Sequence, residues 1–158
     1  MAQEHTTGPY GAHIEQDPEL GTLITLSYTD QQHPTHSLSL GIAPEMGSNM
    51  FRFRVGEHDL IYCDRQLLAR RAFTGDFVLW PLPNRIRDKR YSYQGHEYSL
   101  AAIHRPSGND VLIHGLVFDR VWQFTQPMVT DDAASVTTFV EMRPGDPFYE
   151  SYPFESRL

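Results

Sequence analysis

Short segments of this chain alternate between hydrophobic and polar residues, and this alternation predicts β-strands that are buried on one face. The pattern is clear in residues 22–28 and 37–42, where Leu and Ile alternate with smaller or polar residues. From Gly21 onward, no long stretch places apolar residues at the i, i+3, i+4 and i+7 positions of an amphipathic helix. The sequence therefore predicts an all-β fold, with one short helix over residues 64–72.

Tight turns predict two β-hairpins. Residues 51–55 (FRFRV) have the cleanest period of two in the chain, and residues 56–59 turn this strand back into residues 60–62. The second hairpin is predicted over residues 90–100, where glycine in the Gln94-Gly95 turn supplies the positive φ. Its aromatic side chains are expected to share one face.

The two ends of the chain carry weaker signals. Residues 1–18 mix Gly and Pro with polar residues, so we expect a flexible lead-in, followed by the folded domain over residues 19–158. Later strands are predicted in residues 121–129 and 135–142, which are rich in Val, Phe and Thr. Residues 152–158 read as the start of another strand with no closing turn. We therefore expect a truncated fold whose open sheet edge favours homo-oligomers.

Composition and charge narrow the class of protein. The 158 residues are 40% hydrophobic and 21% charged, as expected of one globular domain. The net charge of -7 disfavours nucleic acid, because binding to a phosphate backbone requires an excess of Lys and Arg. Residues 1–8 do not resemble a signal peptide, and no apolar run approaches the roughly 18 to 20 residues that span a bilayer. We expect a cytoplasmic protein with no membrane partner.

Two segments carry candidate chemistry. Asn84 and Arg85 follow a strand that ends in Trp80-Pro81-Leu82-Pro83, and the prolines give the turn a nearly fixed direction. The planar guanidinium of Arg85 can donate to several sugar hydroxyls. His114 ends an apolar strand, and Gly115 after it allows a ligand to approach the backbone. Taken singly, each residue is more often a surface or structural residue than a functional one.

The order of these segments resembles the aldose 1-epimerase family of sugar mutarotases. That pattern has an Asn-Arg-Ile turn (residues 84–86), a short aromatic hairpin (91–100) and a strand ending in His114-Gly115, with Trp122 further on. Upstream, residues 42–49 (IAPEMGSN) resemble the family's Pro-x-x-Gly-x-Asn turn. No single motif is specific, but the ordered set is. The resemblance spans roughly residues 20–158 and corresponds to the N-terminal half of a family member.

This resemblance implies a fold and a chemistry. Family members form an antiparallel β-sandwich, the galactose mutarotase-like supersandwich, and interconvert the α and β anomers of an aldose without metal or cofactor. A carboxylate removes the proton of the anomeric hydroxyl while a histidine protonates the ring oxygen, so that the ring opens and recloses. By resemblance, Asn84 and Arg85 bind sugar hydroxyls. His114 binds the substrate and takes part in catalysis near the ring oxygen. The implied ligand is a monosaccharide, phosphorylated in some relatives.

Two parts of the family's machinery have no counterpart in residues 1–158. Its proton-donating histidine lies in an Asn-His-x-Tyr-Phe motif, and its base is a glutamate near the C-terminus. His104 lies in an unrelated context, and Glu141, Glu150 and Glu155 are expected to be solvated carboxylates. The expectation is that residues 1–158 lack mutarotase activity by themselves.

Three alternatives stay open. A carbohydrate-binding pseudoenzyme would hold a sugar with Arg85, His114, Trp80 and Trp122 and would not turn it over, although tryptophans are more often core residues. A structural or oligomerising β-domain would use the open edge. A metal-dependent jelly-roll enzyme fits least, because its ligands need closely spaced histidines with a downstream carboxylate on neighbouring strands.

The histidines and arginines bear on two questions: a metal site and a phosphorylated sugar. His33 and His36 lie in a polar loop with Pro34 and are expected to be solvated. A phosphorylated sugar would need extra basic residues, for which the candidates are Arg52, Arg54 and Arg87; surface arginines are the commoner explanation.

Overall fold

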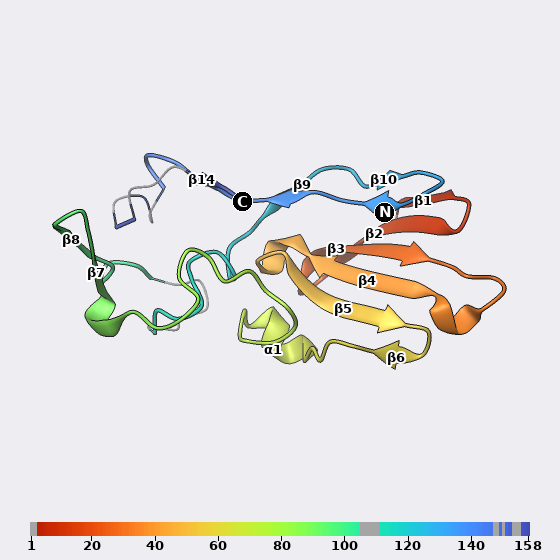
Figure 1. Ribbon diagram of the computed structural model, residues 1–158, viewed down its shortest axis with the longest axis horizontal. Coiled ribbons are helices and arrows are strands. Elements are labelled where there is room, and N and C mark those ends of the chain that lie inside the picture. The colour runs from red at the N-terminus through yellow and green to blue at the C-terminus, as the bar shows by residue number, and fades with distance from the viewer. Residues whose placement is uncertain (1–2, 105–110, 147–148, 150, 153–155) are drawn as a thin grey trace.

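The computed structural model describes residues 3–104, 111–146, 149, 151, 152 and 156–158. Within these residues, the main element is a six-stranded antiparallel sheet in which each strand pairs with the next along the chain (Figure 1). The strands are β1 (Gln3–Thr7), β2 (Tyr10–Asp17), β3 (Gly21–Tyr28), β4 (Leu38–Ala43), β5 (Asn49–Val55) and β6 (His58–Asp59). The predicted strands at residues 22–28, 37–42 and 51–55 are confirmed as β3, β4 and β5.

The expectation that the first strand begins only after residue 18 is wrong. Strands β1 and β2 lie in this segment, and β2 pairs with β3 along its whole length. All five residues of β1 are exposed, and on β2 only Gly11, Ala12 and Ile14 are buried, so local hydrophobicity is weak here. The ladder of hydrogen bonds to β3 compensates for the weak strand propensity of these residues. Whether the domain boundary lies at residue 18 stays a prediction.

The first hairpin returns earlier than predicted. The strand after Val55 is β6, His58–Asp59, whereas the sequence placed it at residues 60–62. The turn needs only Gly56 and Glu57, because Gly56 adopts a φ of 55°. The second hairpin is confirmed with its turn at Gln94-Gly95 and consists of β7 (Arg90–Tyr93) and β8 (His96–Ser99).

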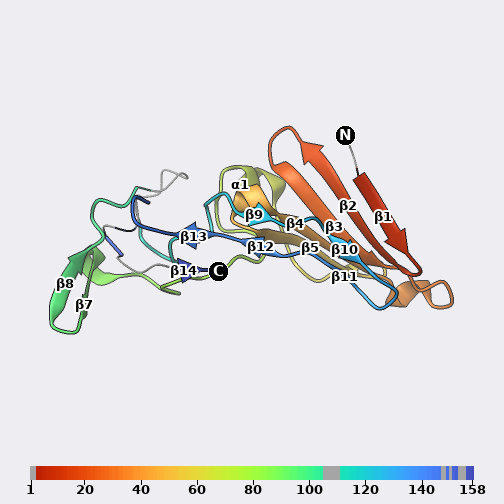
Figure 2. The same cartoon turned by 90° about the horizontal axis from the view of Figure 1, so that it is seen from above.

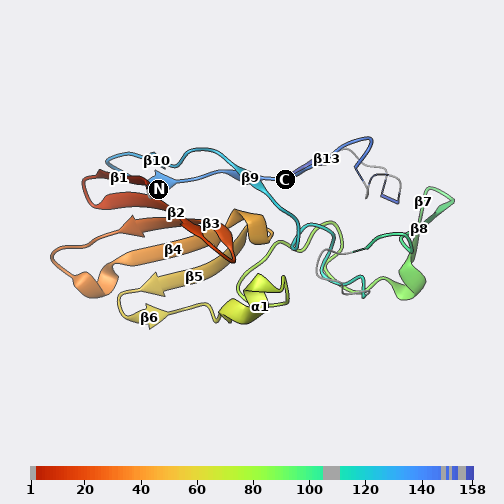
Figure 3. The ribbon, with the colours of Figure 1, turned by 180° about the vertical axis from the view of Figure 1, so that it is seen from behind.

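One α-helix occurs in the described residues, α1 (Arg65–Ala69), inside the predicted range 64–72. It begins where the Asp64 carboxylate accepts a hydrogen bond from the backbone N–H of Leu67 at 2.9 Å. Figure 3 shows α1 beyond the end of β6. Leu68 is buried in a cluster beneath this end of the sheet, whose other buried members are Leu20, Leu23, Ala43 and Met46. The helix therefore forms because Leu68 completes this cluster.

An ion pair ties α1 to the end of β2. The guanidinium of Arg65 lies 2.7 Å from both carboxylate oxygens of Asp17, and the backbone N–H groups of Glu19 and Leu20 donate to Asp17 as well. These bonds, with that from Arg65 as the largest, lower the pKa of the Asp17 carboxyl to about 2.

We expect Asp17→Asn to flatten the dependence of stability on pH in acid. A carboxyl with a lowered pKa binds fewer protons when folded, so its stabilisation is complete above the unfolded pKa of about 3.9. It is lost as the pH falls through about 2. Urea unfolding between about pH 5 and about pH 2 should show a shallower decline in the variant. If stability declined equally steeply in the variant, the Asp17–Arg65 ion pair would not be the cause of the pH dependence.

A second layer lies against the sheet. In this layer β10 (Met128–Val129) pairs with β11 (Ala134–Ser135), and both strands contact β1, β2 and β3 (Figure 2). Two further short pairs lead towards the other end of the molecule: β9 (Gln123–Phe124) with β12 (Thr138–Phe139), and β13 (Glu141–Met142) with β14 (Ser156–Arg157). These pairs confirm the strands predicted in residues 121–129 and 135–142, although each is broken into short pieces.

The β7–β8 hairpin belongs to a second part of the molecule, at one end of the view in Figure 1. Its core contains Leu100, Ile103, Leu112, Leu116, Val117, Trp122, Val140 and Met142, all buried. Within the described residues, no helix has both the length and the apolar character needed to cross a membrane.

Candidate functional site

A turn at the end of β4 joins the sheet to the segment that carries His114. This turn, η2 (Pro44–Met46), is followed by Gly47 with a φ of 77°. The N–H of Gly47 donates to the carbonyl of Arg120 at 2.9 Å, and the N–H of Trp122 donates to the carbonyl of Pro44 at 3.0 Å. A Cβ at Gly47 would lie 1.6 Å from the Phe118 carbonyl oxygen, so only glycine permits this contact. The Pro-x-x-Gly-x-Asn segment thus connects the sheet to residues 118–122 and has a structural role.

The two segments singled out from the sequence lie side by side. The N–H of Leu116 donates to the carbonyl of Trp80 at 2.6 Å, and the N–H of Ile86 donates to the carbonyl of Leu112 at 3.4 Å. Gly115, with a φ of 81°, brings its Cα against Trp80, and a Cβ there would lie 2.0 Å from the Trp80 carbonyl oxygen. The apolar strands predicted to end at Trp80 and His114 are not formed in the described residues; the only β-pairing between the two segments is a single parallel bridge between Trp80 and Gly115. Gly115 therefore sets how closely the segment that contains His114 approaches residues 80–86.

His114 is held by a backbone carbonyl and by aromatic rings. Its Nδ1 lies 3.1 Å from the carbonyl oxygen of Pro83. Because a carbonyl oxygen only accepts, Nδ1 carries the proton in this bond, and Nε2 is the nitrogen with the free lone pair in the neutral ring. The ring meets Phe73 edge-on, with centroids 4.8 Å apart at 88°, and Phe77 at 5.7 Å and 72°. The imidazole thus has a set tautomer and a set orientation.

Asn84 and Arg85 directly follow Pro83, whose carbonyl holds His114. Both are exposed, and the Asn84 side-chain oxygen accepts a hydrogen bond from the backbone N–H of Arg85 at 2.7 Å. This bond lies within the turn and uses the backbone of Arg85, so the guanidinium takes no part in it. The Pro83 carbonyl that holds His114 is therefore covalently continuous with the Asn84-Arg85 turn, and the fold brings all three predicted site residues to one region.

Phenylalanines around His114 were missed by the sequence reasoning. Phe73 and Phe77 stack with centroids 5.8 Å apart, and Phe118 lies 5.3 Å from each of them. Phe73 retains 41% of its surface exposed beside a half-buried histidine, so the cluster forms an apolar wall that is open to solvent. The sequence carried only a weak indication of this cluster: Phe73 and Phe77 are four residues apart, and Phe118 follows His114 by four.

Trp122 and the aromatic hairpin are packing elements in this part of the chain, and the partly buried Trp80 meets the ring of Tyr152 at a centroid distance of 5.8 Å. Trp122 is buried, and its indole N–H donates to the carbonyl of Val117 at 2.9 Å. Tyr91 stacks on Tyr98 with centroids 4.9 Å apart, as expected for side chains on one face of the hairpin. Burial raises the pKa of Tyr91 to about 12.

Other sequence candidates lie elsewhere. Glu141 lies on β13 and pairs with Arg143 at 2.6 Å and with Arg157 at 3.8 Å; its side chain is 29% exposed, so it is partly buried and ion-paired rather than solvated as expected. Glu150 and Glu155 lie outside the described residues. His104 is exposed.

Comparison with known proteins assigns this arrangement to a family. Residues 28–158 match the sequence profile of the family described as aldose 1-epimerase. The chain belongs to this family. It is 39% identical over 71 residues to the uncharacterized protein YihR of Escherichia coli strain K12, a match that covers 45% of this chain and 22% of YihR. The family assignment confirms the resemblance drawn from the ordered motifs.

A solved structure supports the fold class. The chain superimposes on a galactose mutarotase-like protein from Clostridium acetobutylicum with a TM-score of 0.63 and 17% sequence identity, over 91% of this chain and 43% of that protein. The predicted antiparallel, mutarotase-like β-sandwich is thereby confirmed as the fold. The matches cover 22% of YihR and 43% of the Clostridium protein, so this chain spans less than half the length of each.

Proposed function

We propose that Asn84, Arg85 and His114 form part of the sugar-binding site of an aldose 1-epimerase-type protein that interconverts the α and β anomers of an aldose. The observation that carries this proposal is the hydrogen bond between His114 Nδ1 and the Pro83 carbonyl at 3.1 Å. It couples the histidine to the turn that carries the arginine. Family membership over residues 28–158 supports a sugar as the ligand.

Each residue has a distinct part in the proposed chemistry. The guanidinium of Arg85 donates to neighbouring sugar hydroxyls, and the Asn84 amide supplements these bonds. His114 presents Nε2 towards the sugar, because Nδ1 is engaged with Pro83. As a neutral ring, Nε2 accepts from a hydroxyl; as an imidazolium, it donates to the ring oxygen, which favours ring opening. The exposed edge of Phe73 provides an apolar surface for the C–H face of the sugar.

For a phosphorylated aldose, we propose that Arg87 binds the phosphate. Of the three arginines considered for a phosphate, Arg54 donates twice to Asp59, at 3.0 and 3.1 Å. Arg52 lies 5.8 Å from the ring of Phe51 on the same strand, β5. Arg87, in the 3₁₀ turn η3 (Arg87–Lys89), is then the remaining candidate near residues 84–86.

Arg85→Ala and His114→Asn are each expected to weaken galactose binding by about tenfold or more, the cost of losing a hydrogen bond from a charged or oriented donor. Asparagine is chosen because His114 has a φ of 63°, which asparagine tolerates. Binding is measured by NMR titration with galactose, glucose and galactose 6-phosphate. Matched controls on the β5–β6 hairpin, Arg54→Ala and His58→Asn, should leave galactose binding unchanged.

Anomer exchange measured on the same samples separates two forms of the proposal. Exchange above the buffer rate that His114→Asn abolishes indicates turnover by this chain. Binding with exchange at the buffer rate indicates a carbohydrate-binding site without turnover. Galactose binding that neither variant weakens would refute the assignment of the site.

A further inference from the structure

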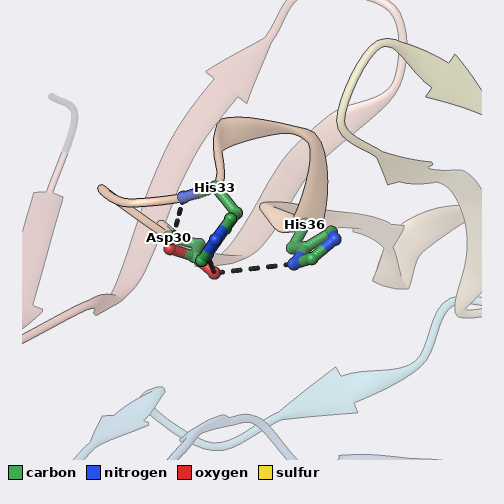
Figure 4. Close-up of side chains that lie close together, drawn as sticks. All are labelled: Asp30, His33 and His36. Carbon is green, nitrogen blue, oxygen red and sulfur yellow. Dashed lines mark hydrogen bonds and ion pairs between the residues drawn. The ribbon is translucent and has the colours of Figure 1, made fainter.

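A cluster of two histidines and a carboxylate lies in the connection between β3 and β4 (Figure 4). The same oxygen of Asp30, Oδ2, lies 3.7 Å from His33 Nδ1 and 3.8 Å from His36 Nδ1. All three potential ligand atoms lie within 4.8 Å of one another. This connection is at the end of the sheet remote from the β7–β8 hairpin (Figure 1), so the cluster is separate from the proposed sugar site.

Local backbone structure orients these side chains. Asp30 uses its other oxygen, Oδ1, to accept hydrogen bonds from the N–H groups of Gln32 and His33, at 2.9 and 2.8 Å. Pro34 then starts the 3₁₀ turn η1 (Pro34–His36). Residues three apart project to the same side of such a turn, and the imidazoles of His33 and His36 stack with centroids 5.2 Å apart. Oδ2 is thereby left facing both rings.

A bond within the loop and contacts with the β5–β6 turn hold η1 in place. The N–H of Asp30 donates to the Ser37 hydroxyl at 3.0 Å, which closes the loop on itself. The N–H of Gly56 donates to the carbonyl of Ser37 at 2.8 Å, and a Cβ at Gly56 would lie 2.8 Å from the Thr35 carbonyl oxygen. The β5–β6 turn therefore packs directly against η1, so the loop is held in place before any ligand arrives.

The donor set selects for one kind of ligand. Two imidazole nitrogens and one carboxylate oxygen suit zinc and similar transition metals, whereas calcium and magnesium prefer oxygen ligands alone. Zn–N and Zn–O bonds of about 2.0–2.1 Å in a tetrahedron place neighbouring ligand atoms about 3.3 Å apart. The separations from Asp30 Oδ2, 3.7 and 3.8 Å, are slightly wider, and the two histidine nitrogens lie within 4.8 Å of each other. Rotation of the two exposed imidazoles would bring the three atoms to these distances.

We propose that Asp30, His33 and His36 bind a zinc ion, with water completing its coordination. The two imidazoles are 62% and 68% exposed, whereas the carboxylate is only 18% exposed. The ion therefore enters from solvent through the histidines and meets a carboxylate that is already positioned. Neither the sheet nor the sugar site has to change for the ion to bind.

The test is calorimetric titration of zinc chloride into the chain after removal of metal with EDTA. One zinc ion per chain is expected. His33→Ala and His36→Ala should each weaken zinc binding by about tenfold or more, because even the loss of a residue that only orients a metal ligand weakens binding by about this factor. Asp30→Asn should weaken it similarly while retaining the Oδ1 hydrogen bonds that form the turn. Thermal unfolding of each variant in EDTA checks that the fold is retained.

His13→Ala is the matched control, because His13 pairs with Glu15 at 3.7 Å on β2 and is also partly exposed. It should leave zinc affinity unchanged, which separates the three-residue cluster from an ordinary pair of histidine and carboxylate. The proposal is overturned if the dissociation constant of the unaltered chain is weaker than about 1 mM. It is equally overturned if the His33→Ala/His36→Ala double variant binds zinc as tightly as the unaltered chain.

Discussion

Gly115→Ala should lower the free energy of unfolding by about 3–5 kcal/mol and abolish galactose binding. The backbone of Gly115 has a φ of 81°, which costs an alanine about 1–2 kcal/mol. The new Cβ would in addition lie 2.0 Å from the Trp80 carbonyl oxygen, a backbone atom that moves only if the two segments separate. Separation breaks the bond from Leu116 N–H to Trp80 and removes His114 from the Pro83 carbonyl.

Gly95→Ala provides the control for this variant. Gly95 has a φ of 79° in the β7–β8 turn, but apart from Gly95 and its two chain neighbours no heavy atom of the described residues lies within 4 Å of the position that a Cβ would take there. Its replacement should therefore cost only the backbone strain, about 1–2 kcal/mol, and should retain sugar binding. Urea unfolding gives both values by linear extrapolation. Equal losses in the two variants would mean that the close approach of Gly115 to Trp80 does not govern stability.

Trp122→Ala is expected to destabilise the protein by about 3–5 kcal/mol, the usual cost of removing a large buried aromatic side chain. Trp122 is 5% exposed and belongs to the cluster around Leu100 and Leu116. Its backbone N–H also joins this cluster to the sheet through the Pro44 carbonyl, and that bond survives the substitution. The stability lost in Trp122→Ala should therefore measure how much the packing of its side chain in the core contributes. Chemical unfolding monitored by circular dichroism measures it without relying on tryptophan fluorescence.

Trp122→Phe separates packing from sugar contact. It should cost about 1–3 kcal/mol, because the smaller ring leaves space and the Val117 carbonyl loses its indole donor. Galactose binding should be unchanged at temperatures where the variant is folded, since the indole lies in the core. Weakened galactose binding without a loss of stability would instead indicate that the indole contacts the sugar.

Features that depend on a few neighbouring residues were predictable from the sequence. The β7–β8 hairpin follows from the Gln94-Gly95 turn, and α1 follows from the Asp64 cap and the apolar Leu68. Strand β3 follows from its own alternation. The turn of the hairpin, the cap of the helix and the pattern of the strand lie within their own segments, which is why pattern and turn chemistry sufficed to locate these elements. The packing of Leu68 in its cluster comes from distant segments.

Features that depend on distant partners were not predictable in this way. Strand β2 forms on few apolar residues because β3 supplies the matching ladder. The orientation of His114 depends on Pro83, which is 31 residues away, and on Phe73. His33 and His36 are exposed, as expected, but their convergence on Asp30 was not foreseen; the turn that produces it is supported by the bond from the Gly56 N–H to the Ser37 carbonyl.

The sequence by itself determined the antiparallel β-class, the family and the three residues Asn84, Arg85 and His114 as candidates for a sugar site. Only the tertiary structure decided how these residues are held: a tautomer set by the Pro83 carbonyl, a wall of phenylalanines, and a Gly115 contact with Trp80. The physical reason is that strand propensity and turn type are local properties of the backbone, whereas hydrogen bonds and ring contacts between distant segments exist only after the chain has packed.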